Sequence, residues 1–160
     1  MTTLHLMVGL PCSGKSTRAK QLEAEFGALR LTPDEWHITL FGNDTADPDH
    51  DRRHDAVEAL MWQVASAALA KGVDVILDFG FWARAEREDF AARAAGLDAQ
   101  TRIHFMDVSR DELLARLEQR NAEAPEHAFI ITANELLGWM ARFEPVTEDE
   151  LEKLQPPSAP

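Results

Sequence analysis

The chain has 160 residues, a formal net charge of −12 and a 45% share of hydrophobic residues, which indicates one acidic globular domain. Its single cysteine, Cys12, excludes an internal disulfide framework and favours a cytoplasmic setting, and the lack of a long apolar stretch excludes a membrane partner. The acidity also argues against long nucleic acids as partners, because these are bound largely through Lys and Arg.

Short apolar runs alternate with helix-like segments along the chain. We expect strands at 3–8, 28–32, 73–78 and 101–108. Helices are expected at 15–26, from residue 33, and at roughly 52–71, 84–95, 109–121, 132–143 and after residue 147. This alternation predicts an α/β fold in three layers, with a parallel sheet and helices on both of its faces. We expect one domain over 1–154 and a proline-rich flexible tail over 155–160.

Several helices carry signals for their first turn or their buried face. Thr32 and Glu35 have the spacing of a capping box, as do Thr147 and Glu150 near the end of the chain. The long helix at roughly 52–71 has apolar residues at helical spacing, which predicts a buried face made of Val57, Leu60, Met61, Val64 and Ala68.

The segment GLPCSGKS at 9–16 matches the phosphate-loop pattern G-x-x-x-x-G-K-[ST], with a strand expected before it and a helix after it. Its N–H groups can form an anion-binding nest, Lys15 can reach the β- and γ-phosphates of ATP, and the Ser16 hydroxyl can ligate Mg²⁺. The pattern predicts a P-loop NTPase fold, and the short chain favours a small kinase. The expected nucleotide contacts in this loop are Gly9, Pro11, Cys12, Ser13, Gly14, Lys15, Ser16 and Thr17.

Two aspartates follow expected strands at the carboxyl edge of the sheet, where α/β folds place their ligands. Asp78 closes the run VDVILD, and we expect it to support Mg²⁺ or to bind substrate; its alternative role is to cap the next turn. Asp34 lies just past the second strand, where a carboxylate can accept the proton of an acceptor hydroxyl. Its alternative role is to stabilise the start of its own helix.

These landmarks together resemble a known family. GLPCSGKST, PDEW, a strand that ends in Asp and a helix that ends in R-N are similar to the small P-loop kinases of the AAA-33 type, which are related to phage polynucleotide kinase. Zeta toxins and chloramphenicol phosphotransferase are more distant relatives. The resemblance spans residues 1 to about 122 and implies a short helical lid at about 120–133. It also implies that Asp34 is the general base and that Arg120 closes over the phosphates.

Further cations are candidates for the site. Arg116 and Arg120 are four residues apart on one helix face, so both can contact the nucleotide phosphates; the alternative is ion pairs with nearby glutamates. Arg84 and Arg87 follow Asp78 and are expected to bind the acceptor, the alternative being solvated charges on a helix face.

One departure from the family concerns the acceptor. His37 stands where polynucleotide kinase has an arginine that holds the acceptor's phosphate, and the second lid arginine is missing as well. We therefore expect a small-molecule acceptor that contacts His37. The six histidines show no metal-ligand spacing with cysteine, so no zinc site is expected.

The sequence thus predicts an enzyme that moves the γ-phosphate of ATP, with Mg²⁺, to a hydroxyl of a sugar, nucleoside, antibiotic or nucleotide-sugar. Lys15, Asp34 and Arg120 are the expected catalytic residues, and Ser16 and Asp78 are the expected metal ligands. The alternatives are a polynucleotide 5′-hydroxyl kinase and a non-catalytic ATP-binding switch. The sequence leaves open whether the protein is a monomer or a dimer, and whether it has an antitoxin-like partner.

Overall fold

The computed structural model of the chain describes residues 1–123, 126 and 128–155. Its strands are β1 (Thr3–Val8), β2 (Leu29–Leu31), β3 (Val75–Gly80) and β4 (Gln100–Phe105). Its helices are α1 (Lys15–Phe26), α2 (Pro33–Phe41), α3 (His50–Ala70), α4 (Arg84–Ala95), α5 (Arg110–Glu123), α6 (Ala133–Arg142) and α7 (Glu148–Leu154). The tail expected at 155–160 lies outside the described residues except for its first position.

The four strands form one parallel sheet with the order β2-β3-β1-β4. β1 pairs with β3 from Leu4↔Val75 to Val8↔Gly80, so the carboxyl ends of these two strands lie side by side. The loop that follows β1 therefore begins next to the residues that end β3.

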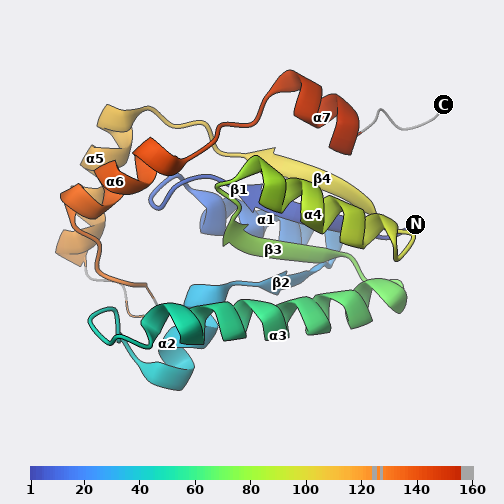
Figure 1. Cartoon of the computed structure of the whole chain (residues 1–160), viewed down its shortest axis with the longest axis horizontal. Coiled ribbons are helices and arrows are strands. Elements are labelled where there is room, and N and C mark those ends of the chain that lie inside the picture. The colour runs from blue at the N-terminus through green and yellow to red at the C-terminus, as the bar shows by residue number, and fades with distance from the viewer. Residues whose placement is uncertain (124–125, 127, 156–160) are drawn as a thin grey trace.

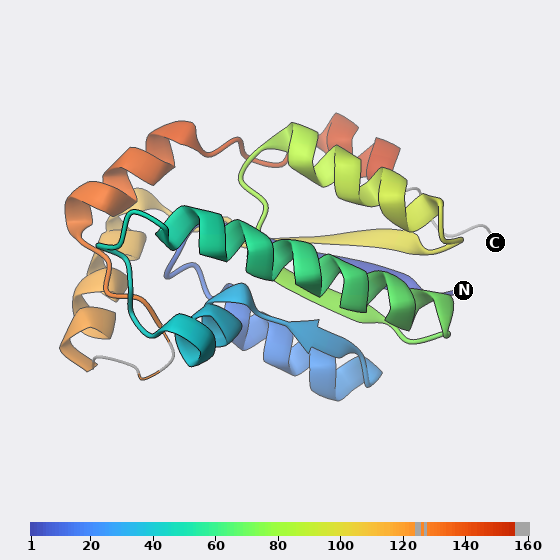
Figure 2. The same ribbon diagram turned by 60° about the horizontal axis from the view of Figure 1, so that its bottom comes forward.

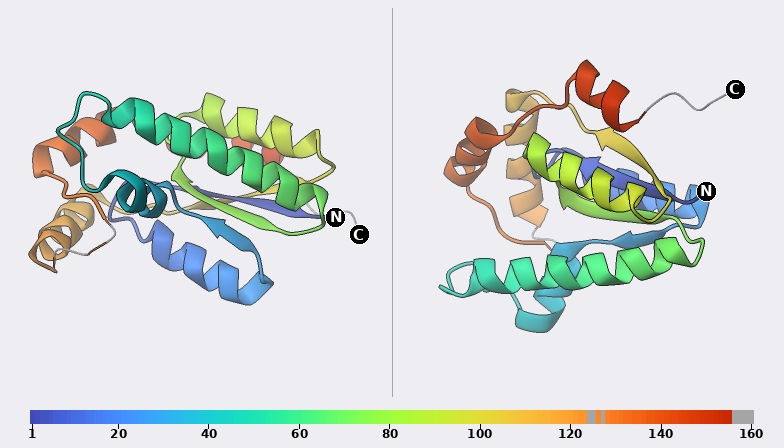
Figure 3. Two further views of the ribbon diagram at one scale, coloured as in Figure 1. Left: turned by 90° about the horizontal axis from the view of Figure 1, so that it is seen from below. Right: turned by 45° about the vertical axis from the view of Figure 1, so that its right-hand side comes forward.

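Helices cover both faces of this sheet, as Figure 2 and the left view of Figure 3 show. Successive residues of a strand point to opposite faces, so one apolar run serves two layers. Met7 and Ile76 pack against Ala19 and Leu22 of α1 on one face. On the other face, α3 and α4 cover alternate strand residues, namely Leu4, Leu6, Val8, Val75 and Leu77. The predicted three-layer α/β fold is thus confirmed.

The helices α5 and α6 lie at the carboxyl end of the sheet, opposite the N-terminus in Figure 1. They bury a separate apolar cluster made of Leu10, Leu113, Leu117, Ile131 and Leu136. The expected lid at about 120–133 includes the end of α5 and the approach to α6, but its residues 124, 125 and 127 lie outside the described part of the chain. Among the described helices, none is long and apolar enough to cross a bilayer.

The strand β3 begins and ends later than the sequence analysis predicts. The expected strand covered 73–78, but Val73 is 40% exposed and the strand continues to Gly80, which pairs with Val8 of β1. The strand continues past Asp78, whose side chain is only 6% exposed and accepts hydrogen bonds at one carboxylate oxygen from hydroxyl groups of α1 and of the N-cap of α2. Asp78 is therefore a buried strand residue and not the residue that ends the strand.

The long helix α3 buries Val57 and Met61 as predicted and packs Val64 and Ala68 against the core, but it does not bury Leu60. Leu60 is 48% exposed, and the fully buried positions follow a strict four-residue spacing: Val57, Met61, Ala65 and Leu69. Ala65 is fully buried in the core cluster, although a pattern based on large apolar residues favours Leu60 at the buried face.

Two expected capping boxes give way to longer-range contacts. The Thr32 hydroxyl donates to Asp78 Oδ2 at 3.2 Å and accepts from Arg30 Nη1 at 2.7 Å, so it makes no side-chain cap for α2. Glu35 pairs with Arg30 at 3.1 Å. At the start of α7, Glu150 is buried and makes no capping contact either. In both places a buried charge elsewhere in the fold competes for the capping side chain.

Candidate active site

The segment 9–16 forms a tight loop between β1 and α1. The backbone φ angle is positive at Gly9 (155°), Cys12 (66°) and Gly14 (91°). A Cβ atom at Gly9 would lie 2.7 Å from Ser13 Oγ and 3.2 Å from Met106 Cβ, so only glycine fits there. Gly14 is the left-handed N-cap of α1, and no side chain caps this helix. The first N–H groups of α1 are thus available to an anion.

Lys15 is the first residue of α1, and its side chain folds back over the loop. Its ammonium Nζ donates to the Leu10 carbonyl at 2.9 Å. Burial lowers the pKa of Lys15, and the negative charges of Asp78 and Asp34 oppose this effect. The ammonium therefore lies within electrostatic reach of two carboxylates at the phosphate loop.

Asp78 faces the start of α1 across the carboxyl edge of the sheet. Ser16 Oγ donates to Asp78 Oδ2 at 2.7 Å, and the Thr32 hydroxyl donates to the same oxygen. The other oxygen, Oδ1, is buried and has no hydrogen-bond partner among the described residues. Burial raises the pKa of Asp78, and the charge of Lys15 acts against it. An unpartnered carboxylate oxygen beside a hydroxyl is a donor set that suits Mg²⁺.

Asp34 lies in the first turn of α2, and its side chain is 46% exposed. His54 of α3 brings Nε2 to 3.9 Å from Asp34 Oδ1 and to 3.5 Å from Glu58 Oε1. Although burial lowers the pKa of His54, the hydrogen bond to Glu58 and the charge of Asp34 raise it above the ordinary value. His54 is a neighbour of the candidate base that the sequence analysis missed, because 20 residues separate the two along the chain.

The two lid arginines of α5 both reach the phosphate loop at Cys12. Arg120 places Nη1 at 3.7 Å from Cys12 Sγ and donates through Nη2 to the Phe129 carbonyl at 3.1 Å. Arg116 donates through Nη1 to the Cys12 carbonyl at 3.4 Å and pairs with Glu112 at 2.8 Å. Three other residues were predicted from the motif to contact the nucleotide. Pro11 and Ser13 lie in the loop, and Thr17 is exposed in the first turn of α1.

Arg84 and Arg87, which were expected to bind the acceptor, instead contact α7. Arg87 is fully buried, pairs through two nitrogens with Glu150, and donates to the carbonyl groups of Phe81 and Glu144. Arg84 forms ion pairs with side chains of α4 and α7. The predicted acceptor contacts of Arg84 and Arg87 do not fit this placement, because protein groups occupy their donors.

His37, one turn after Asp34 on α2, is also fully buried. Its Nε2 lies 2.6 Å from Asp44 Oδ1, and its Nδ1 lies 3.3 Å from His54 Nδ1. The predicted contact of His37 with an acceptor does not fit, because the ring is inaccessible and both nitrogens have partners. The structure therefore gathers Lys15, Ser16, Asp34, Asp78, Arg116 and Arg120 around the loop and leaves out His37, Arg84 and Arg87.

Known proteins share this arrangement of strands and helices. A family model described as an AAA domain matches residues 4–146. A candidate kinase from Chloroflexus aurantiacus superposes with a TM-score of 0.73 and 17% identity, over 91% of this chain and 82% of that one. Kti12 of Chaetomium thermophilum, solved in complex with ADP-AlF3, superposes with a TM-score of 0.60 and 19% identity, over 94% of both chains.

A third similar structure is a chain of the Pnkp1/Rnl/Hen1 RNA repair complex. It superposes with a TM-score of 0.65 and 20% identity, over 89% of this chain. This chain spans 46% of that relative's length. No curated protein sequence matches. At these identities the likenesses show a shared fold.

Proposed function

The chain belongs to the AAA domain family, and from this premise we propose that it is a phosphotransferase that moves the γ-phosphate of ATP to a hydroxyl group. The observation that carries the proposal is the contact between Ser16 and Asp78, with Asp78 Oδ1 buried and unpartnered. A buried carboxylate oxygen without a partner is costly, so its presence beside a phosphate loop indicates a ligand that completes it.

The loop and Lys15 bind the nucleotide in this proposal. The free N–H groups at the start of α1 hold phosphate oxygens, and the Lys15 ammonium exchanges the Leu10 carbonyl for the β- and γ-phosphates. Ser16 and Asp78 would hold Mg²⁺, which when bound supplies positive charge against the phosphate oxygens. Kti12, which has a similar fold, was solved in complex with ADP-AlF3, and this supports a nucleotide as a ligand.

Asp34 prepares the acceptor. As the acceptor oxygen forms its bond to the γ-phosphorus, the bond from phosphorus to the β–γ bridging oxygen breaks and ADP leaves with that electron pair. The hydroxyl proton moves to the Asp34 carboxylate, which later releases it to solvent. Its side chain is half-exposed, as a base that meets an incoming acceptor requires.

The lid arginines act on the phosphates. Both Arg116 and Arg120 contact Cys12 inside the loop, so either guanidinium lies beside the place proposed for the phosphates. Positive charge on the transferring phosphoryl group stabilises the transition state and displaces water that would compete with the acceptor.

We propose a small molecule as the acceptor. A net charge of −12 disfavours a polyanion, and His37 is buried and therefore out of reach of an acceptor phosphate. A polynucleotide 5′-hydroxyl is the second candidate, because a chain of the Pnkp1/Rnl/Hen1 RNA repair complex has the same fold.

A labelled-phosphate assay tests both candidates. The protein is incubated with γ-labelled ATP, Mg²⁺ and either a pool of sugars, nucleosides and antibiotics or a 5′-hydroxyl oligonucleotide, and labelled products are identified by mass spectrometry. Asp34→Asn should lower turnover about 10²- to 10⁴-fold, the usual contribution of a general base, with ATP affinity kept. Glu35→Gln, which removes the next carboxylate on the same helix, is the matched control and should keep the rate.

The outcomes separate the alternatives. Product in the small-molecule pool supports the proposal, and product on the oligonucleotide alone supports the second candidate. ATP binding without any labelled product would instead identify a switch module. An Asp34→Asn variant as fast as the parent would leave this residue with only a helix-stabilising role.

A further inference from the structure

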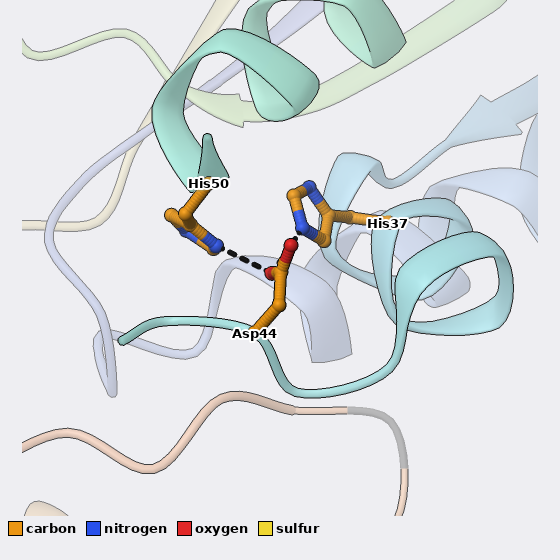
Figure 4. A group of neighbouring side chains, drawn as sticks. All are labelled: His37, Asp44 and His50. Atoms are coloured by element: carbon orange, nitrogen blue, oxygen red, sulfur yellow. Dashed lines mark hydrogen bonds and ion pairs between the residues drawn. The ribbon is translucent and has the colours of Figure 1, made fainter. Parts of the chain in front are cut away.

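Three side chains outside the phosphate loop meet at a single oxygen atom. We call His37, Asp44 and His50 the histidine–aspartate cluster. His37 Nε2 and His50 Nδ1 each lie 2.6 Å from Asp44 Oδ1, and the ligand atoms of all three side chains lie within 4.8 Å of one another. Figure 4 shows both imidazole rings directed at the carboxylate, one from α2 and one from the start of α3.

The cluster joins three segments of the chain. His37 comes from α2, His50 is the first residue of α3, and Asp44 lies in the loop between the two helices. The cluster side chains are nearly out of reach of solvent, with exposures of 0% for His37, 9% for Asp44 and 17% for His50. Two histidines and a carboxylate that converge in a secluded place resemble a set of metal ligands more than a surface ion pair.

A second layer of contacts holds the aspartate in place. Arg53 Nη1 binds Asp44 Oδ2 at 2.7 Å and Asp47 Oδ2 at 3.1 Å. The arginine thus occupies one carboxylate oxygen and leaves Oδ1 to face the two imidazoles. Because two carboxylates surround this single arginine, the local charge stays negative and favours a cation.

The remaining nitrogen of His37 also has a partner. Its Nδ1 lies 3.3 Å from His54 Nδ1, and His54 Nε2 in turn lies 3.5 Å from Glu58 Oε1. If Nε2 of His37 binds a metal, the ring proton is on Nδ1, and this N–H donates a hydrogen bond to Nδ1 of His54. The N–H at Nε2 of His54 then faces Glu58. Metal-binding histidines usually donate their second N–H to such a partner.

Aromatic rings close the cluster from outside. Phe129 meets the rings of His37 and His50 edge-on, with centroid distances of 5.4 Å and 5.2 Å, and Phe41 meets His37 at 5.2 Å. An apolar cover limits water and strengthens the interaction between a cation and its ligands.

We propose that the histidine–aspartate cluster binds one Zn²⁺ ion through His37 Nε2, Asp44 Oδ1 and His50 Nδ1. Two imidazoles and one carboxylate suit Zn²⁺, whereas Mg²⁺ and Ca²⁺ prefer oxygen ligands. A tetrahedral ion with bonds of about 2.0–2.1 Å needs ligand atoms roughly 3.3 Å apart, so the 2.6 Å contacts open by about 0.7 Å on binding. A water molecule takes the fourth position.

Such an ion would fix the loop between α2 and α3. His37 lies one turn from Asp34 on α2, so the ion would hold the helix that presents the candidate base. The proposed metal site does not depend on the proposed phosphotransferase activity, because its metal binding is measured without nucleotide or acceptor.

Co²⁺ serves as the probe, because tetrahedral Co²⁺ with nitrogen ligands absorbs strongly in the visible region and competes with Zn²⁺ for the same ligands. Protein without a histidine tag and without nucleotide is stripped with a chelator and titrated with Co²⁺, and Zn²⁺ is then added. The expected result is saturation at one Co²⁺ per chain with tetrahedral bands, which disappear as Zn²⁺ displaces the probe. Zn²⁺ should also raise the melting temperature of the stripped protein.

Four variants locate the ion. His50→Asn and Asp44→Asn each remove one ligand, and each should weaken Co²⁺ binding by more than about 100-fold. His54→Asn removes an outer partner, and a loss of about 10- to 100-fold is expected. His104→Asn, in the other histidine pair of the structure, is the matched control and should bind like the parent.

Each outcome decides the proposal. The proposal is overturned if the parent shows no saturable one-to-one binding of Co²⁺, or if the bound Co²⁺ gives octahedral bands. The three side chains would then only form hydrogen bonds with one another. Equal losses in His104→Asn and His50→Asn would place the ion elsewhere and also overturn the proposal. If His50→Asn unfolds, the parent titration and the melting shift with Zn²⁺ still give the answer.

Discussion

The buried ion pair between Arg87 and Glu150 gives a quantitative test of how α7 is held. Both side chains are fully buried, and Arg87 also donates to two carbonyl groups. Replacement of Glu150 by Gln keeps the shape but leaves the guanidinium buried without a counter-charge. Removal of one partner of a buried pair costs about 3–5 kcal/mol, a large share of the roughly 5–15 kcal/mol that stabilises a domain.

The assay is urea unfolding followed by the fluorescence of the four tryptophans, together with thermal unfolding. For a chain of this size, a loss of 3–5 kcal/mol corresponds to a drop in melting temperature of about 6–20 °C. Glu148→Gln, at an exposed position of the same helix, is the matched control and should change the free energy of unfolding by less than about 0.5 kcal/mol.

A double replacement distinguishes a structural role of Arg87 from a role in phosphate transfer. Arg87→Met with Glu150→Leu removes both charges, and such swaps are often neutral or stabilising. If this double variant regains stability and phosphate transfer together, Arg87 has a structural role. A Glu150→Gln protein as stable as the parent would refute the reasoning, because the carboxylate would then not be the counter-charge of Arg87.

Three further predictions concern the site and its surroundings. Lys15→Ala should abolish nucleotide binding in a fluorescent-nucleotide titration and leave the melting temperature unchanged, whereas Lys20→Ala should bind like the parent. Arg120→Ala should lower kcat about 10³- to 10⁵-fold in the labelled-phosphate assay, the range known for an arginine that contacts transferring phosphate, while Arg110→Ala should not. Burial raises the pKa of Glu86 to about 7 in the folded protein. The free energy of unfolding therefore falls as pH rises from about 4.5, the ordinary pKa of this side chain, to about 7. Glu86→Gln should therefore be more stable than the parent by about 1–2 kcal/mol at pH 8, allowing for partial solvent exposure, and equal to it at pH 4, as urea unfolding at both pH values will show.

The sequence predicts the local elements well because local signals set them. Gly27 follows the predicted helix at 15–26 and ends α1 in the left-handed conformation. The helix α4 begins and ends at the residues that the pattern indicates. Such signals act within one or two helical turns, so they are visible in the letters alone.

The sequence patterns could not predict which polar side chains pair with residues far away along the chain. Glu150 has the spacing of a capping residue, yet a counter-charge 63 residues earlier draws it into the core. His37 occupies a position that family resemblance assigns to the acceptor, yet Asp44 and His54 take both of its nitrogens. In each case a polar side chain meets a partner that only the folded chain brings near, and burial makes that partner stronger than the local one.

The pairing of Arg87 with Glu150 also has a consequence for the order in which the protein assembles during synthesis. Arg87 leaves the ribosome 63 residues before its counter-charge, because chains emerge from the N-terminal end. Until Glu150 has been made, burial of the guanidinium lacks its counter-charge, which disfavours the final packing of α4. The interior between α4 and α7 is therefore expected to close only after the last helix of the chain has been synthesised.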